Sequence, residues 1–160
     1  ASSCEHHISH FWEMGLADGV DPNALHGEKV GMNELRLLEL YKKTDLDALL
    51  RQPLRFRDIE EDIRRAYGDV ADSIVKENTP DCTRSLKPEL IEKNLDEVKK
   101  LYAALPESEE LRELMAGVGC TVEPEALGCD KKTMDYCIDY ACYVRNRLTL
   151  MRMRRVLLAE

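Results

Sequence analysis

The sequence predicts an all-α fold, organised as one helical domain over residues 1–160. Apolar residues recur three and four positions apart through most of the chain, which is typical of amphipathic helices packed on a core. No stretch alternates apolar and polar residues over five positions between turn signals, so no strand is expected. The 160-residue length suits one domain, and 44% hydrophobic residues are enough to form a packed core. Seven to nine helices are predicted.

Turn-forming residues divide the first half of the chain. The sequence GLADGVDPN separates the first two helices. Pro53 ends a short third helix because a proline cannot continue one, and Gly68 stops the stripe that contains Ile59 and Ile63. The helices expected here cover 5–14, 25–43, 45–51, 57–67 and 69–77.

The second half begins with NTPDCTRSLKP, which predicts a loop with some mobility. A helix with a 3.6-residue apolar repeat is expected at 89–105. Acidic residues from Glu107 onward favour the start of the next helix, which ends near Gly117. Asp130 is the expected N-cap of a last helix, whose apolar positions continue to Leu148.

Charge and hydropathy exclude two classes of partner. A net charge of −8 argues against nucleic acid, whose phosphates require a positive field. No apolar run approaches the roughly 20 residues of a membrane span, and no signal segment opens the chain. We therefore expect a cytoplasmic protein without membrane insertion.

The six cysteines predict neither a disulfide framework nor a zinc site. The chain has no CxxC motif, and the closest pair, Cys137 and Cys142, lies five positions apart in a helical pattern. Helical neighbours are three or four apart, so this pair does not share a face. We interpret the cysteines as reduced thiols that are mostly buried.

All four histidines lie in the first 26 residues, at His6, His7, His10 and His26. In a helix His6 and His10 share a face, and the loop before His26 is short enough to fold the next helix start back onto them. Histidine is the commonest side-chain metal ligand. One histidine from each segment could bind one divalent metal, with Glu5 or Glu13 as an outer partner.

The same residues also fit a histidine-containing surface helix without a ligand, because spacing alone is a weak signal. Catalytic zinc normally has three protein ligands, whereas the sequence supplies two well-placed histidines and no obvious third ligand. From the residues alone, both interpretations stay open.

Two stretches of sequence resemble one enzyme family. SSCEHHISHFWEM followed by LHGEKVG resembles the metal-binding region of the sn-glycerol-1-phosphate dehydrogenases. These enzymes belong to the superfamily of iron-containing alcohol dehydrogenases, glycerol dehydrogenase and 3-dehydroquinate synthase. The closing ACYVRNRLTLMRMRRVL, from Ala141, is similar to that family's C-terminal helix, so the resemblance spans essentially the whole chain.

The resemblance implies the helical C-terminal domain of a two-domain enzyme with the dehydroquinate synthase-like fold. An N-terminal α/β domain, not matched in this chain, would bind NAD(P). His6 and His26 match two ligands of a divalent metal, which could be zinc, nickel or iron, and an aspartate preceding this region would be the third. His10 matches a histidine of the same pocket, in substrate contact or proton relay, and His7 would be a bystander.

The implied reaction interconverts dihydroxyacetone phosphate and sn-glycerol 1-phosphate, so the expected partner is a small phosphorylated triose or polyol. The complete enzyme would form a homo-oligomer, and this chain by itself would be inactive. A fragment of a glycerol dehydrogenase is an alternative. So is a 3-dehydroquinate synthase-like enzyme, although its motif is closer to GHTFGH. The third alternative is a non-catalytic helical interaction module.

Two other features have competing interpretations. Five arginines near the C-terminus could contact a phosphate. They could equally form a cationic helix end that pairs with an acidic protein, which is the interpretation we favour. Phe11 and Trp12 are more typical of core residues than of a stacking site. The arginines are Arg145, Arg147, Arg152, Arg154 and Arg155.

Overall fold

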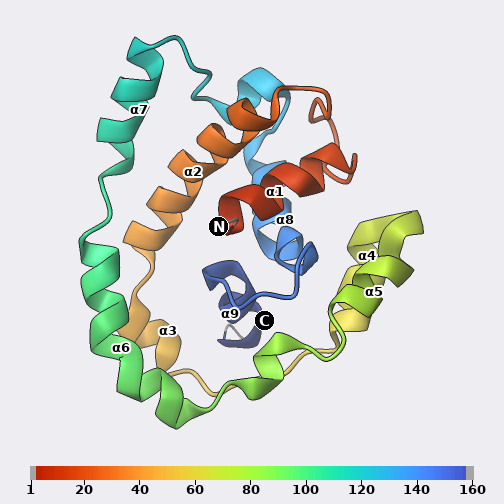
Figure 1. Ribbon diagram of the computed structural model, residues 1–160, viewed down its shortest axis with the longest axis vertical. Helices are drawn as coiled ribbons and strands as arrows, with labels where there is room; N and C mark the ends of the chain where they lie inside the picture. Colours follow the sequence, from red (N-terminus) through yellow and green to blue (C-terminus); the bar gives the residue numbers. More distant parts are fainter. Residues whose placement is uncertain (1–2, 158–160) are drawn as a thin grey trace.

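The computed structural model describes residues 3–157, and within that range every regular element is a helix, as predicted. In Figure 1, α1, α8 and α9 lie near the centre and the other helices pass around them. The α-helices are α1 (Cys4–Glu13), α2 (His26–Lys43), α3 (Leu46–Leu50), α4 (Ile59–Tyr67), α5 (Ala71–Glu77), α6 (Pro88–Ala103), α7 (Ser108–Gly117), α8 (Lys131–Tyr140) and α9 (Leu150–Leu157). Four 3-10 turns join them: η1 (Gly68–Val70), η2 (Cys82–Ser85), η3 (Pro124–Leu127) and η4 (Ala141–Tyr143).

The main core forms around α1, which packs against α2, α8 and η4. Phe11 is fully buried and meets the ring of Tyr67 edge to face, with centroids 5.2 Å apart. Trp12 is 1% exposed, and its indole Nε1 donates to the Cys137 sulfur at 3.2 Å. Burial of each large apolar side chain contributes about 1.5–3 kcal/mol. The prediction that Phe11 and Trp12 belong to the core is confirmed.

Helix ends follow the local signals in the sequence. The Asp130 carboxylate accepts a hydrogen bond from the Thr133 backbone N–H at 2.7 Å, as expected of an N-cap. Gly68 ends α4 with a φ of 48°, a backbone conformation that residues with a Cβ rarely adopt. Both predicted boundaries are confirmed.

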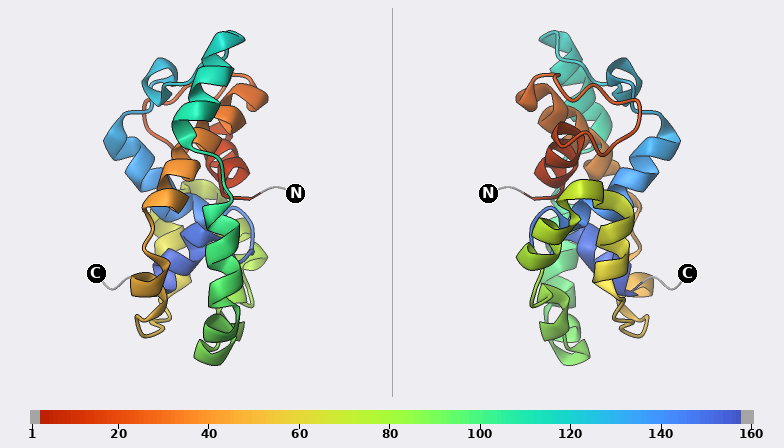
Figure 2. Two further views of the ribbon diagram at one scale, coloured as in Figure 1. Left: turned by 90° about the vertical axis from the view of Figure 1, so that its left-hand side faces the viewer. Right: turned by 90° about the vertical axis from the view of Figure 1, so that its right-hand side faces the viewer.

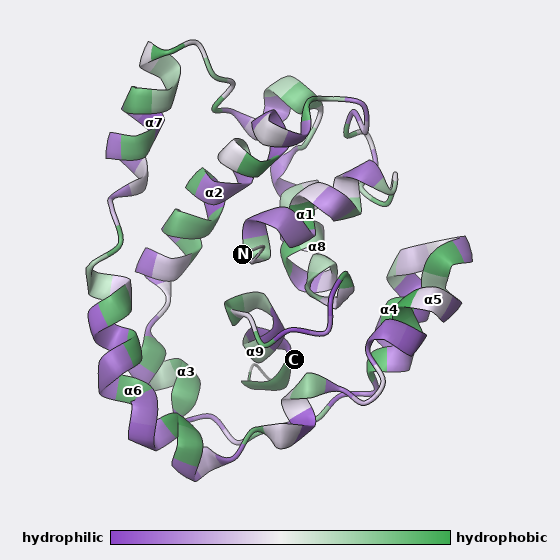
Figure 3. Ribbon diagram, in the orientation of Figure 1, coloured by the Kyte–Doolittle hydropathy of each residue, from purple (hydrophilic) through white to green (hydrophobic). Residues whose placement is uncertain are grey.

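α6 and α7 lie one after the other along one edge of the molecule, beside α2 and α3 (Figure 2). Neither helix contains a fully buried residue. Figure 3 shows hydrophobic and hydrophilic positions alternating along α6, as expected of an amphipathic helix with one packed face. The inner face of α6 contributes Tyr102 to a second, smaller cluster with Leu49, Leu150 and Leu157.

The prediction of one continuous last helix as far as Leu148 is wrong. α8 ends at Tyr140, η4 follows, and α9 starts afresh at Leu150. The cause is tertiary: the Asn146 side-chain amide donates to the Pro80 carbonyl at 2.7 Å and accepts from the Cys82 backbone N–H at 2.9 Å. These contacts hold the segment between η4 and α9 against a distant loop, off the axis of α8.

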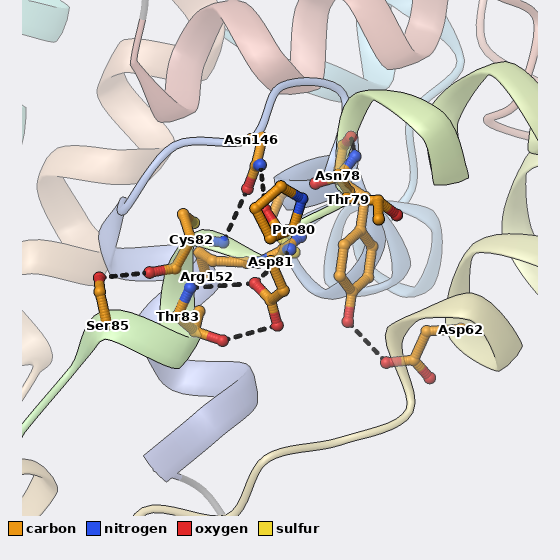
Figure 4. Close-up of polar contacts among 12 residues, drawn as sticks. Asp62, Asn78, Thr79, Pro80, Asp81, Cys82, Thr83, Ser85, Asn146 and Arg152 are labelled. Carbon is orange, nitrogen blue, oxygen red and sulfur yellow. Dashed lines mark hydrogen bonds and ion pairs between the residues drawn. The ribbon is translucent and has the colours of Figure 1, made fainter.

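The loop from Asn78 to Pro88, expected to be mobile, is held in place by side-chain contacts (Figure 4). Asn78 is fully buried and donates to the Tyr143 carbonyl at 2.7 Å. Asp81 accepts from Arg152 at 2.9 Å, and this arginine side chain is 1% exposed. The loop also contains the 3-10 turn η2. The local turn signals therefore identified the break between α5 and α6, but not that the connecting segment is well ordered.

Two of the C-terminal arginines form structural ion pairs, as the favoured interpretation predicted. Arg152 pairs with Asp81, and its guanidinium lies 4.3 Å from the centre of the Tyr143 ring. Arg155 pairs with Asp62 at 2.7 Å, and Asp62 also accepts from the Tyr143 hydroxyl at 2.7 Å. These contacts fasten α9 to the η2 loop and to α4.

The six cysteines are free thiols, and Cys4, Cys129, Cys137 and Cys142 are buried, as predicted. Burial raises the pKa of the Cys137 thiol to about 11, although the Trp12 hydrogen bond opposes the shift. Within residues 3–157, no helix combines the length and the apolar character that crossing a bilayer requires.

Candidate metal centre

Three of the four histidines meet where α1 packs against the start of α2. The ring centroids of His10 and His26 are 5.3 Å apart, and those of His6 and His26 are 5.6 Å apart. His6 and His10 lie one turn apart on α1, with centroids 6.4 Å from each other. The fold therefore brings together the three histidines that the sequence singled out.

The loop between α1 and α2 makes this meeting possible. The Asp21 backbone N–H donates to the Leu127 carbonyl at 3.0 Å, which attaches the loop to η3. Gly128 has a φ of 84°, and a Cβ at this position would collide with the Gly19 carbonyl oxygen. This close backbone contact requires glycine. It sets the path that returns the chain to His26.

Each of the three imidazoles has its Nδ1 against a carboxylate. His6 Nδ1 is 2.8 Å from Glu5 Oε1, and His10 Nδ1 is 2.9 Å from Glu13 Oε2. His26 Nδ1 is 2.7 Å from the other oxygen of Glu13. One carboxylate therefore joins α1 to α2 through two histidines.

Glu13 is ionised throughout the neutral range. Partial burial raises its pKa, but hydrogen bonds from the two imidazoles and from Lys29 outweigh this effect and lower the pKa to about 2. Lys29 is 1% exposed, with Nζ 3.2 Å from Glu13 Oε1 and 2.9 Å from the Pro22 carbonyl oxygen. The buried ammonium group of Lys29 thus forms an ion pair with the Glu13 carboxylate.

The carboxylates determine which nitrogen of each ring carries the proton. An ionised carboxylate can only accept, so the neutral imidazole beside it donates through Nδ1–H and keeps its lone pair on Nε2. The side chains of His6, His10 and His26 are 31%, 39% and 47% exposed. A histidine ligand whose other nitrogen donates to a carboxylate is the usual arrangement in metal sites. The donor set therefore fits a divalent transition metal.

One further geometric grouping is present among the described residues. His10, Glu13 and His26 each offer a ligand atom, and the three atoms lie within 4.8 Å of one another. His6 lies outside this tightest group but has its ring beside that of His26. The assignment of His6 and His26 as metal ligands, and of His10 to the same pocket, remains a prediction that the geometry accommodates.

His7 is fully buried on α1, whereas the other three histidines are partly exposed. Neither ring nitrogen has a hydrogen-bond partner within residues 3–157. Burial lowers the pKa of His7 to about 4, and the positive charge of Arg147 adds to this effect. His7 is therefore neutral near pH 7 and separated from the three clustered rings.

Sequence reasoning missed three residues of α2 that contribute to the site. Lys29 follows His26 by three positions and supports Glu13. Asn33, fully buried, donates to the Ser9 hydroxyl at 3.2 Å and joins α2 to α1. Glu34 lies near Glu5, whose charge adds to the burial that raises the pKa of Glu34. Helical spacing from His26 places Lys29 and Asn33 on its face, which was the available signal.

Comparison with curated proteins finds relatives of one kind. The chain is 27% identical over 152 residues to the glycerol-1-phosphate dehydrogenase (NAD(P)+) of Geobacillus stearothermophilus, over 94% of this chain and 32% of the relative. It is 28% identical over 152 residues to that of Geobacillus thermodenitrificans, with the same two coverages. A 47-residue stretch, 29% of this chain and 12% of the relative, is 47% identical to the Bacillus subtilis enzyme. No protein-family model and no solved structure matches the chain.

The fold and the site together define a helical domain with a histidine and carboxylate cluster suited to a metal. The comparisons with curated proteins identify the enzymes to which the chain is related. The chain is a distant homologue of glycerol-1-phosphate dehydrogenases and spans about a third of the length of the curated relatives it matches.

Proposed function

We propose that residues 1–160 are the metal-binding helical domain of an NAD(P)-dependent sn-glycerol-1-phosphate dehydrogenase. The observation that carries the proposal is the meeting of His6, His10 and His26, each with Nδ1 on a carboxylate. The homology supports it, because the relatives are named as NAD(P)+ glycerol-1-phosphate dehydrogenases. The reaction proposed for the complete enzyme interconverts dihydroxyacetone phosphate and sn-glycerol 1-phosphate.

In this proposal His6 and His26 hold the metal through Nε2. When bound, the metal supplies Lewis-acid polarisation of the substrate oxygen, and NAD(P) supplies the hydride chemistry. Glu5 and Glu13 hold the imidazoles in the required tautomer and orientation. In the complete enzyme, where the family resemblance assigns the third ligand to an aspartate outside this chain, Nε2 of His10 is available to exchange a proton with the substrate.

Metal-linked stabilisation tests the proposal on this chain. A ligand at 100 times its Kd adds about 2.7 kcal/mol of stability, which for a domain of this size raises Tm by about 5–10 °C. We expect zinc or nickel to produce such a shift, and the His6→Ala/His26→Ala double variant to lose it. Equal melting curves with and without metal would refute the metal site and favour a non-catalytic interaction module.

Activity requires the complete protein. We expect NADH or NADPH oxidation with dihydroxyacetone phosphate and much slower turnover of dihydroxyacetone, because the site is proposed to take a phosphorylated triose. The reverse preference would assign the protein to the glycerol dehydrogenases instead. A cytoplasmic location and a homo-oligomeric complete enzyme are parts of the same proposal.

A further inference from the structure

We infer that α6 pairs with α6 of a second copy of this chain, with the two helices antiparallel about a two-fold axis. The inference rests on the homo-oligomer of the proposed function and names its contact surface. α6 lies along one edge of the molecule, where its inner face packs on α2 and α3 (Figure 2). Its outer face consists of five exposed positions: Leu90, Asn94, Glu97, Leu101 and Ala104.

The outer face has the spacing of a helix that packs along its length against another helix. Its positions follow one another at intervals of four, three, four and three residues, which is the 3.5-residue repeat of paired helices. Leu90 and Leu101 are 51% and 61% exposed, and helical rise separates them by about 16 Å along the same line. A surface helix normally has charged or polar residues on the face away from the core. The two leucines therefore indicate a contact with a further helix.

An antiparallel second copy aligns the outer-face positions in complementary pairs. When Leu90 faces Leu101 of the second copy, Asn94 faces Glu97, because both pairs are centred on the same point of the helix. The dimer then has a leucine contact at each end and two amide–carboxylate contacts between them. One N–H of the Asn94 amide donates to the Leu90 carbonyl at 2.7 Å, and the other can donate to the Glu97 carboxylate of the second copy. A polar contact between apolar ones fixes the register of paired helices.

The charges beside the outer face also complement those of a second copy. Four exposed residues form a charge row that alternates in sign and sums to zero: Glu89, Lys93, Asp96 and Lys100. Within the described part of the chain, none of the four forms an ion pair. In the antiparallel register, Lys100 of one copy lies within a helical turn of Glu89 of the other, and Lys93 lies within a turn of Asp96. Opposite charges in these positions bring two copies together and set their orientation.

The neighbouring helix α7 lacks this complementarity. Leu114 and Val118 are even more exposed than the leucines of α6, at 70% and 80%. However, the exposed charged residues of α7 are all glutamates, namely Glu109, Glu110 and Glu113. Two copies of this face would repel each other. The charge pattern therefore favours α6, rather than the more apolar α7, as the contact with a second copy.

Sedimentation velocity over a range of protein concentrations tests the inference. α6 has 16 residues and extends about 24 Å, so the contact is small and we expect reversible dimers with a Kd of about 10 µM. Leu101→Lys should raise this Kd at least about 100-fold, because two-fold symmetry removes both leucine contacts at once. Leu114→Lys, at the exposed leucine of α7, is the matched control and should dimerise like the parent chain. Glu97→Gln keeps an acceptor for Asn94 and should also dimerise.

Two charge variants test the antiparallel pairing itself. Lys93→Glu/Lys100→Glu makes the charge row wholly acidic, and Glu89→Lys/Asp96→Lys makes it wholly basic. Each variant alone should be monomeric because its copies repel. An equimolar mixture of the two should form heterodimers at least as readily as the parent chain forms homodimers. Circular dichroism of each variant checks that the helices are intact.

The outcomes separate this inference from the proposed function. If the parent chain stays monomeric, or if Leu101→Lys dimerises like the parent chain, α6 is not the contact and the inference is wrong. If the mixed charge variants stay monomeric, the antiparallel pairing is wrong. The metal-linked shift in Tm is measured on the same variants, whose substitutions lie outside α1 and α2. Its presence in a monomeric chain would refute the dimer contact alone, and its absence from a dimeric chain would refute the metal site alone.

Discussion

Removal of the Asp81 charge from its ion pair with Arg152 should be among the most destabilising single substitutions in this chain. Both partners are buried: the side chain of Arg152 is 1% exposed and that of Asp81 is 8% exposed. The pair joins the η2 loop to α9 at 2.9 Å, and two other guanidinium nitrogens of Arg152 have no hydrogen-bond partner among the described residues. Asp81→Asn therefore removes the main charge that balances a buried cation.

The expected cost follows from that burial. Breaking a buried ion pair on one side costs about 3–5 kcal/mol, since the remaining charge is left uncompensated. Asparagine keeps one acceptor oxygen, which can still accept hydrogen bonds from Arg152 and from Thr83. We therefore place the cost of Asp81→Asn near the lower end of this range, at about 3 kcal/mol. That amount is a large fraction of the about 5–15 kcal/mol available to a typical domain.

Urea unfolding followed by the fluorescence of Trp12, the only tryptophan, measures this cost. Glu97→Gln serves as the control and should change stability by less than about 0.5 kcal/mol. Burial raises the pKa of Asp81, but its contacts with Thr83 and Arg152 outweigh this and lower it. The difference between parent and variant should therefore be full above the ordinary aspartate pKa and vanish as pH falls through the lowered one. A cost below about 1 kcal/mol at pH 7 would refute the reasoning.

Two further predictions concern other parts of the fold. Gly128→Ala should cost about 2–4 kcal/mol in urea unfolding, because its positive φ and the Gly19 carbonyl both oppose a Cβ, whereas Gly117→Ala, in open space at the end of α7, should cost nothing. With a chelator present, stability should fall by about 3 kcal/mol between pH 6.5 and 4, since the pKa of His7 is lowered in the folded chain and charging favours unfolding. His7→Leu should flatten that pH dependence, and an unchanged slope would show that another group causes it.

The fold class and most helix boundaries could be predicted because their signals are local. The 3.6-residue repeat marked the helices, and residues such as Asp130 and Gly68 act on the backbone within one turn. The same holds for the grouping of His6 and His10, which helical spacing alone places on one face.

The errors and omissions all involve contacts between distant parts of the chain. The apolar pattern through Leu148 is compatible with a helix, but the contacts of Asn146 with Pro80 and Cys82 hold the segment after η4 against a distant loop. The η2 loop is rich in turn-forming residues, yet Arg152 of α9 holds it in place. Local propensity cannot anticipate either result, because each partner lies more than 60 residues away in sequence.

Some features of the histidine site could also be predicted from the sequence, whereas others depend on the tertiary structure. The histidines, their concentration in the first 26 positions and the two carboxylates among them, Glu5 and Glu13, were evident from the sequence, because they depend only on composition and spacing. The tertiary structure decided that Glu13 serves two histidines and that a buried Lys29 supports it. It also separated His7 from its three neighbours, since burial depends on which face of α1 meets the core. Sequence proximity supplies the donors, and the packing of α1 on α2 determines how they are oriented.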